Sequence, residues 1–291
     1  MGKIRISWRA CALFLLVHVV AVVGVIAFGV SGRGIALAAA LYAVRMFALS
    51  AGVHRYFSHR AFETSRAFQL VLAVVATMAS QLGVLWWASQ HRIHHRVTDG
   101  PGDPHDRTRG FWWAHVGWFL TDAHDATEWK QIPDLARYPE LRWLDRNHFA
   151  PAIALIAVLG LVGGPWAIVW GYAVSTVLLW HAMFSLNSIA HGVGDRRFDT
   201  GDLSRNNPVL ALATFGEGWH NNHHHFPGAA RAGFAWWEVD ISYAMLRVLE
   251  MCGIVWNLRG VPARVMAHVT GKPVVDALAD TVEQPALSEA A

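Results

Sequence analysis

The sequence predicts an all-α integral membrane protein, with four transmembrane helices in two hairpins, an interfacial helix and a helical cytoplasmic cap. Of its 291 residues, 54% are hydrophobic and 15% are charged, whereas soluble domains carry about 25% charged residues. Several apolar runs are long enough to cross a bilayer. The chain contains 17 histidines but only two cysteines, Cys11 and Cys252. Its polar chemistry therefore depends on imidazole rather than on thiolates or a disulfide framework.

The first hairpin is predicted from two apolar runs, residues 11–30 and 35–53, joined by residues 31–34. At 1.5 Å per residue, the 20 residues of the first run cover the roughly 30 Å of bilayer hydrocarbon. A cleaved signal peptide is the alternative for this run. The run is longer than the apolar region of such a peptide, and a second apolar run follows at once, so a membrane hairpin is favoured.

The second hairpin is predicted from residues 149–163 and 166–190. Gly163, Gly164 and Pro165 lie between these two runs, and such residues are typical of a turn. Four spans in two hairpins return both ends of the chain to the same side of the membrane.

Three residues inside the predicted spans have an imidazole or guanidinium side chain. His18 and His181 are each alone among apolar residues, and we expect them to be packed and hydrogen-bonded. Arg45 is the one charge within a span. A charge in that position either serves the function or pairs with a neighbouring helix.

Basic residues flank the predicted spans mainly on one side, because the link between the first two spans offers only Arg33 and the link between the last two offers no charge. By the positive-inside rule, the N-terminus and the cap, residues 54–148 and 191–270, lie in the cytoplasm. The flanking basic residues are Arg5, Arg9, Arg55, Arg60 and Arg66. The net charge of +3 includes no basic block, so no nucleic-acid partner is expected.

Two further segments lie outside the spans. Residues 68–87 are apolar but include Gln69, Ser80 and Gln81, so we expect a helix that lies in or dips into the membrane interface. Residues 271–291 have little periodicity and are expected to form a flexible tail.

Histidines cluster in three boxes, followed by a single histidine after the last span. In the HxxHH boxes, positions i, i+3 and i+4 share one helical face, so each box is expected to aim its imidazoles at a common point. His54 and His59 would be 140° apart on an α-helix, so they are expected to bind different metals or to straddle a helix end. The candidate ligands are His54, His59, His91, His94, His95, His191, His220, His223 and His224.

Nine imidazoles are too many for one tetrahedral zinc and match two metals with four or five ligands each. Imidazole suits iron, copper, zinc or nickel, so the ligand type alone does not choose the metal. An isolated HxxHH is usually a surface or capping feature, but two of them in so apolar a chain favour a metal site. His225, His105 and His115 are expected to be structural or solvated.

The boxes and their flanking residues resemble those of the membrane fatty acid desaturases, specifically the stearoyl-CoA (delta-9) type and its bacterial relatives. The similarity covers about residues 10–255. The segments that carry it are Gly52-Val-His54-Arg-Tyr-Phe-Ser-His59, Trp87-Ala-Ser-Gln-His91-Arg-Ile-His94-His95, Asp103-Pro-His105, Arg109-Gly-Phe-Trp-Trp-Ala-His115-Val-Gly-Trp118, Asn187-Ser-Ile-Ala-His191 and Gly216-Glu-Gly-Trp-His220-Asn-Asn-His223-His224-His225.

This resemblance implies that the nine histidines hold two iron ions, with Asn187 reaching one of them through a water. It implies an O2-dependent enzyme that places a cis double bond at the ninth carbon of a saturated long-chain acyl-CoA. The partners would be O2, membrane lipid and a separate electron donor, a ferredoxin or a cytochrome b5-like protein with its reductase. The location would be a bacterial inner membrane, with the site facing the cytoplasm.

Five further residues are candidates for supporting roles. Glu217 and Asp99 lie near the boxes in sequence and would orient ligand imidazoles. Gln81 and Trp87 align with family residues that line the acyl channel. Tyr42, about three turns before His54, is a candidate stop for the end of the chain.

The sequence departs from the animal acyl-CoA enzymes where those bind CoA. Residues 121–123 read Thr-Asp-Ala in place of a basic pair, and Ser89 replaces an arginine. The acyl carrier is therefore either CoA held by other arginines, such as Arg107, Arg109 or Arg142, or a phospholipid.

Two other functions remain open from the sequence. A hydroxylase on the same di-iron scaffold would act on an alkane, a lipid or a carotenoid. A histidine-rich metal transporter or sensor would need ligands inside the spans, whereas most of these histidines lie at span ends or in the cap.

Overall fold

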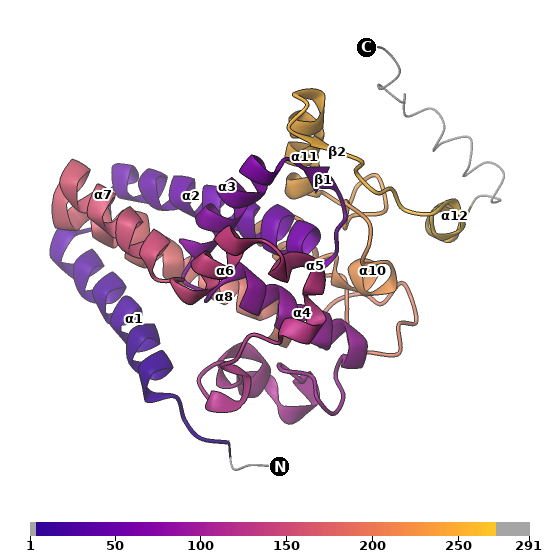
Figure 1. Ribbon diagram of the computed structural model, residues 1–291, viewed down its shortest axis with the longest axis horizontal. Coiled ribbons are helices and arrows are strands. Elements are labelled where there is room, and N and C mark those ends of the chain that lie inside the picture. The colour runs from indigo at the N-terminus through magenta and orange to yellow at the C-terminus, as the bar shows by residue number, and fades with distance from the viewer. Residues whose placement is uncertain (1–3, 272–291) are drawn as a thin grey trace.

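The computed structural model describes residues 4–271 and is mostly helical (Figure 1). The predicted tail, residues 271–291, lies outside the described residues except for Gly271. Three helical runs are long and apolar enough to cross a membrane: Trp8–Phe28, Gly32–Ser58 and Ala150–Ser188. The third run covers both segments predicted for the second hairpin.

The membrane-length runs are not regular α-helices throughout. A π-helix carries i→i+5 hydrogen bonds and is found mostly at functional sites, and two of the three runs contain one. The elements are α1 (Trp8–Phe28), α2 (Gly32–Phe47), the π-helix η1 (Ala48–Ser58), α7 (Ala150–Ala167), the π-helix η6 (Ile168–Val174) and α8 (Ser175–Ser188).

Two connections decide how these runs fold. α2 begins at Gly32, two residues into the predicted link, because Ser31 Oγ accepts a hydrogen bond from Gly34 N at 3.1 Å and caps the helix. The run from α7 breaks at Gly164 (φ 62°, ψ −159°), within the predicted turn. The chain folds back there, since a Cβ on Gly171 of η6 would lie 2.9 Å from Leu159 of α7.

η6 is the centre of the membrane-length helices. α1 packs on it where a Cβ on Gly24 would lie 2.6 Å from Val169 Cγ1. α2 packs on it where a Cβ on Gly34 would lie 2.6 Å from the Trp170 ring. Small residues therefore let two helices approach η6 closely, as is usual in membrane bundles.

The two isolated span histidines bond to each other, which confirms the prediction that they are packed and hydrogen-bonded. His18 Nε2 of α1 lies 3.0 Å from His181 Nε2 of α8. His181 Nδ1 lies 2.9 Å from His115 Nε2, and His115 Nδ1 lies 2.8 Å from Ser188 Oγ. This chain of bonds joins α1 to α8 and to the segment around residue 115.

Arg45 is 1% exposed and joins α2 to η6, to α8 and to the loop after α3. No carboxylate of residues 4–271 forms an ion pair with it. Its guanidinium instead donates to neutral oxygens of Leu41, Met78, Gly171, Ser175 and Thr176. The predicted alternative of an ion pair is therefore not found among the described residues.

The cap is built mainly from short helices, in keeping with the predicted helical cap, and its described residues include one two-stranded ladder. β1 pairs antiparallel with β2, with Glu63 opposite Trp256. The elements are β1 (Glu63–Thr64), α3 (Arg66–Thr77), α4 (Val84–Val97), η2 (Arg107–Arg109), η3 (Trp113–Gly117), η4 (Asp122–His124), η5 (Trp129–Gln131), α5 (Pro133–Ala136), α6 (Pro139–Arg146), α9 (Pro208–Ala213), α10 (His220–His225), α11 (Ile241–Met251), β2 (Val255–Trp256) and α12 (Ala263–Thr270).

The predicted single helix over residues 68–87 is wrong. α3 ends at Thr77, and Ser80 and Leu82 have φ values of 55° and 60°, which an α-helix cannot contain. α4 starts anew at Val84, where Asp145 Oδ1 accepts a hydrogen bond from Trp86 N at 2.9 Å. This break sets the direction of α4, which carries the second histidine box.

We predict that Gly83→Ala destabilises the protein. A Cβ on Gly83 would lie 2.7 Å from Asp145 Cα, a backbone atom that can move only with α6. Overpacking of this kind costs about 1–3 kcal/mol, so the melting temperature in detergent should fall. Gly32→Ala is the matched control, because no atom lies within 4 Å of the position that its Cβ would take. Equal melting temperatures for both variants would contradict the role of this contact.

Candidate metal centre

The π-helix η1 brings His54 and His59 to the same face. Because i→i+5 bonds place residues five apart one above the other, the 140° separation expected for an α-helix does not apply. The two ring centroids are 5.1 Å apart. The expectation that the two residues would bind different metals is therefore not met by their placement, whereas His59 does lie at the helix end, as its C-cap.

The nine histidines form two groups, each with one ring nitrogen per residue within 4.8 Å of the others. The first group lies between η1, α4 and α10, and the second between α4, the end of α8 and α10. The first group contains His54, His59, His91, His95 and His223. The second group contains His94, His191, His220 and His224.

Each HxxHH box contributes to both groups, which corrects the expectation of a common point for each box. On α4, His91 and His95 face the first group, whereas His94 faces the second. On α10, His223 faces the first group, whereas His220 and His224 face the second. The two helices therefore hold the groups side by side.

Ring nitrogens converge closely within the first group. His223 Nε2 lies 3.0 Å from Nε2 of both His54 and His95. His59 Nε2 lies 2.9 Å from His91 Nε2. A ring nitrogen of a neutral imidazole carries either one proton or one lone pair, so His223 Nε2 can form a hydrogen bond with only one of its two neighbours.

The ring nitrogens of the second group also converge without enough protons to satisfy them. His191 and His224 each place Nδ1 beside a carboxylate, so their protons lie on Nδ1 and their Nε2 atoms are lone pairs. Both lone pairs face His220 Nε2, at 3.0 and 3.1 Å. His94 Nε2 is buried and has no hydrogen-bond partner. A cation between these atoms would satisfy all of them, so the residues fit a bound metal ion.

Four carboxylates contact imidazoles at Nδ1, the ring nitrogen that faces away from the two groups. The Nδ1 atoms of His54, His94, His191 and His224 lie 2.5–2.9 Å from Glu217, Asp103, Asp99 and Asp202, respectively. Such partners fix the tautomer and the ring orientation of metal-binding histidines. Glu217 and Asp99 thus lie where supporting residues were expected from the sequence.

Sequence reasoning missed Asp103 and Asp202. Asp103 stands in a segment that carried the family resemblance, eight residues after His95. Asp202 had no comparable signal, because the loop that holds it reaches His224 only in the folded chain. Thr200 Oγ1 and Ser204 N donate to its Oδ1 at 2.6 and 2.9 Å and hold the carboxylate in place.

Burial keeps seven of the nine imidazoles neutral, which is the form that binds a metal. Burial, with a smaller effect of neighbouring imidazoles, lowers the pKa of His95 to about 3. The same causes lower the pKa well below the usual value for His59, His91, His94, His220, His223 and His224.

Glu217 is a buried anion with three kinds of partner. Burial alone would raise its pKa, but Arg55 and His54 outweigh burial and lower the pKa to about 2. Arg55 Nε donates to its Oε1 at 2.9 Å, and Ser50 Oγ donates to the same oxygen. The carboxylate that orients His54 is therefore ionised at neutral pH.

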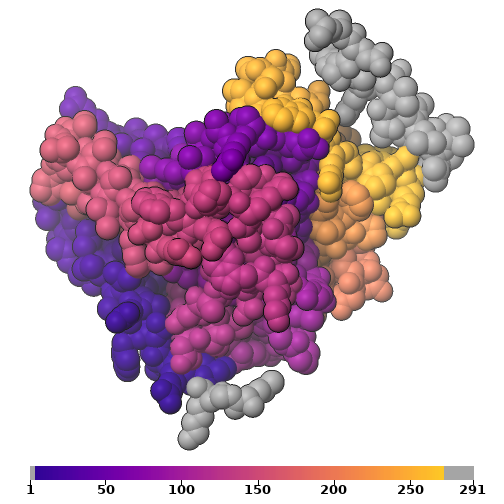
Figure 2. Space-filling model, viewed as in Figure 1, coloured from indigo at the N-terminus to yellow at the C-terminus, as the bar shows by residue number. Residues whose placement is uncertain are grey.

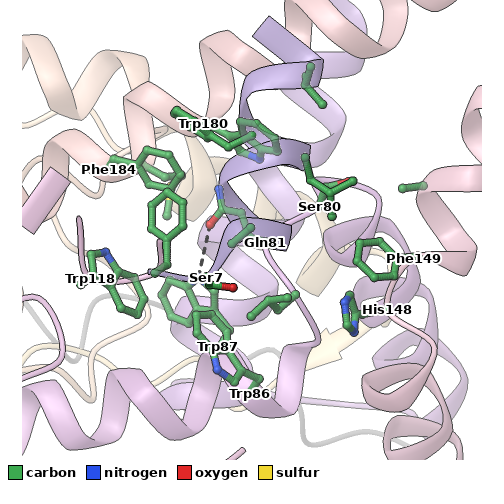
Figure 3. Close-up of a pocket in the computed structure, with 18 of the residues that line it drawn as sticks. Ser7, Ser80, Gln81, Trp86, Trp87, Trp118, His148, Phe149, Trp180 and Phe184 are labelled. Atoms are coloured by element: carbon green, nitrogen blue, oxygen red, sulfur yellow. Dashed lines mark hydrogen bonds between the residues drawn. The ribbon is translucent and has the colours of Figure 1, made fainter. Parts of the chain in front are cut away.

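A cavity of about 840 Å³ leads to the two groups, and His54, His91 and His220 form part of its wall. Apolar and aromatic side chains make most of the lining. Figure 3 shows Trp118 and Phe184 on one side and His148 and Phe149 on the other. This size and lining are typical of a site for an apolar ligand.

The sequence-predicted channel residues differ in their placement. Gln81 and Trp87 both line the cavity, and Trp87 Nε1 donates to Gln81 Oε1 at 3.3 Å. Asn187 also lines it. Tyr42 is not among the lining residues; its hydroxyl donates to Ala213 O at 2.5 Å. The structure therefore gives no support to a chain stop at Tyr42.

His105 is a lining residue that sequence reasoning set aside as structural or solvated. It is buried, and its ring centroid lies 4.1 Å from that of His94. Its Nδ1 lies 3.7 Å from Asp103 Oδ1. Asp103 therefore contacts both His94 and a residue of the cavity wall.

Known proteins with similar sequences indicate the family of this chain. Residues 33–250 match the family model described as fatty acid desaturase. The chain belongs to the fatty acid desaturase family. This desaturase is thus an oxidoreductase that acts on fatty acids, and its family uses iron.

Three named relatives show how broad the similarity is. The desaturase is 35% identical to an sn-1 stearoyl-lipid 9-desaturase of Anabaena variabilis over 259 residues, which are 88% of this chain and 95% of the relative. It is 32% identical to an sn-1 stearoyl-lipid 9-desaturase of Synechocystis over 271 residues, 91% and 84% of the two chains. It is 38% identical to an acyl-CoA 5-desaturase of Anemone leveillei over 233 residues, 79% and 72% of the two chains.

We predict that Asp202→Asn weakens iron binding by about 10–100-fold, because loss of a partner that orients a metal-binding histidine has an effect of this size. Competition with a chelator, followed by metal analysis of the protein, measures the affinity. Asp199→Asn is the matched control, since the Asp199 side chain is 94% exposed and pairs only with Arg196 at 2.9 Å. Equal iron affinities for the two variants would contradict the role of Asp202.

Proposed function

We propose that this desaturase uses O2 and two iron ions to place a cis double bond at the ninth carbon of a saturated long-chain acyl group. The observation that carries the proposal is the contact between the two histidine groups and an apolar cavity. His54, His91 and His220 belong to the groups and also line the cavity. A methylene chain in the cavity would therefore lie next to the metals.

Each histidine group would hold one iron ion. The first offers five imidazoles and the second offers four, and Asn187, which lines the cavity, would reach one of the ions through a water. Neutral imidazoles leave the ions cationic, unlike the carboxylate-rich di-iron sites of soluble helix bundles. Glu217, Asp99, Asp103 and Asp202 would set the ring orientations.

In the reaction, the residues of this protein position the acyl chain and exclude water from the site. When bound, the irons supply the oxidant that removes hydrogen from an unactivated methylene. The overall reaction takes O2, two electrons, two protons and two hydrogen atoms from adjacent carbons, and it yields one alkene and two waters. The aromatic walls, with Trp87 beside His91 at a ring distance of 4.8 Å, hold the chain against the site.

The proposal includes four membrane crossings in two hairpins, in a bacterial inner membrane. Two observations support it. The run Ala150–Ser188 breaks at Gly164 and folds back on itself, so it can cross twice. The flanking arginines favour a cytoplasmic cap and site.

A separate electron donor is part of the proposal, a ferredoxin or a cytochrome b5-like protein with its reductase. The sequence has only two cysteines and no GxGxxG fingerprint, which supports a donor outside this chain. The acyl carriers named for the relatives are a lipid in the two cyanobacterial proteins and CoA in the plant protein, so CoA and lipid are both candidates here.

We predict that a bacterial host expressing the wild-type chain accumulates a cis monounsaturated fatty acid that His95→Ala fails to produce. His95 belongs to the first group, and its loss removes one of five donors. Gas chromatography with mass spectrometry measures the product and the position of the double bond.

His225→Ala is the matched control for this experiment. His225 adjoins the third box but belongs to neither group, and its ring stacks on Phe198 at 3.9 Å. This variant should keep the activity. A product that contains added oxygen would instead identify a hydroxylase, and an unchanged lipid profile would contradict the proposal.

A further inference from the structure

The cavity is walled on two sides by membrane-length helices that do not seal it. Leu13 and Leu16 of α1 line it, and so do Ile153 and Ile156 of α7. In Figure 1 these helices diverge toward their N-terminal ends, and in Figure 2 the indigo α1 lies at the edge of the molecule below the pink α7. The cavity therefore extends between α1 and α7.

Several of these lining residues are also exposed at the outer surface. Leu13 is 45% exposed, Leu16 is 56% exposed and Ile153 is 62% exposed. The rest of the protein therefore leaves these side chains partly uncovered where α1 and α7 diverge. Both helices are long and apolar enough to span a membrane, so a gap between them would face the bilayer.

The other side of α1 is closed. Phe14 stacks on Trp180 of α8 at 5.5 Å, and His18 bonds to His181 of α8 at 3.0 Å. Within residues 4–271 no hydrogen bond or ring contact joins α1 to α7. The polar and aromatic contacts thus anchor α1 to α8 and leave its α7 side without such a link.

A few of the residues that line the cavity are polar. Arg9 at the start of α1 and His148 just before α7 line the cavity, and so does Asp125 of the cap. An apolar cavity with a few polar lining residues near the helix starts matches an amphiphile whose chain enters first and whose head stays at the membrane surface.

We infer that the substrate is an acyl chain of a membrane lipid, which slides sideways from the bilayer into the cavity between α1 and α7. The inference rests on the proposed function and names its acyl carrier. The lipid's glycerol and head group would remain beside Arg9, Asp125 and His148. The chain would reach the histidine groups past Trp180 and Phe184.

The charges favour a lipid over CoA. CoA carries several phosphates, whereas the cavity lining includes one arginine, Arg9, and one carboxylate, Asp125. The three arginines expected to hold CoA do not line the cavity. Arg109 instead lies over the Trp113 ring at 3.3 Å, and Arg107 Nε donates to Ser188 O at 2.8 Å.

A photocrosslinking experiment tests this route without relying on activity. The full-length protein is reconstituted in phosphatidylethanolamine and phosphatidylglycerol vesicles that contain a lipid with a diazirine on its saturated sn-1 chain. We expect adducts on Met183 and Phe184, which line the cavity and are only 5% and 7% exposed. The double variant Leu13→Trp/Ile153→Trp should reduce these adducts several-fold by blocking the entry between α1 and α7.

Two controls separate blocking from damage. Val158→Trp adds the same ring to an exposed position of α7 that does not line the cavity, and it should leave the adducts unchanged. Val162 of α7, 83% exposed, should be labelled equally in all variants. Because Leu13 and Ile153 are already exposed, the larger side chains should not disturb the core.

The outcomes distinguish this inference from the proposed function. Equal adducts on Met183 and Phe184 with and without the blocking substitutions would overturn the route. Conversion of stearoyl-CoA by the purified protein, with no adducts in the cavity, would also overturn it and identify CoA as the carrier. Adducts that the double variant removes, in a protein that forms no double bond, would support the route while contradicting the proposed function.

Discussion

The structure depends on gathering nine imidazole lone pairs into two small volumes inside a protein. Four carboxylates make this possible, because each lies within 2.9 Å of the Nδ1 atom of one histidine and favours the tautomer whose Nε2 lone pair faces the group. Burial adds to the effect by keeping rings such as those of His94 and His224 neutral. A cation between the Nε2 atoms of His191 and His220, which are 3.0 Å apart, would satisfy both. The surrounding fold therefore sets the directions of the lone pairs that would bind metal.

Irregular helices are the means by which the fold meets this requirement. η1 is a π-helix, and its i→i+5 spacing brings His54 and His59 into one group. η6 is another, and it forms the centre on which α1 and α2 pack. The break at residues 78–83 redirects the chain so that α4 presents its box to both groups.

Much of the architecture follows from the sequence alone. Apolar run length predicts the membrane-length helices, and Gly164 lies at the turn that residues 163–165 predict. The interfacial segment is predicted less well, since hydropathy over residues 68–87 carries no information about a break. That break depends on Asp145, nearly sixty residues further along, which caps α4. A local hydropathy pattern carries no information about contacts between residues so far apart in the sequence.

For the site, the sequence by itself determined nine candidate ligands, because histidines in boxes within so apolar a chain are too unusual to be surface features. Only the tertiary structure decided how the nine histidines divide between the two groups. Each box serves both groups because η1, α4 and α10 meet at different faces, and helical spacing within one box cannot show where neighbouring helices lie. The same holds for Asp202, which a loop brings to His224, and for the divergence of α1 and α7, which occurs because α1 is anchored to η6 and α8 rather than to α7.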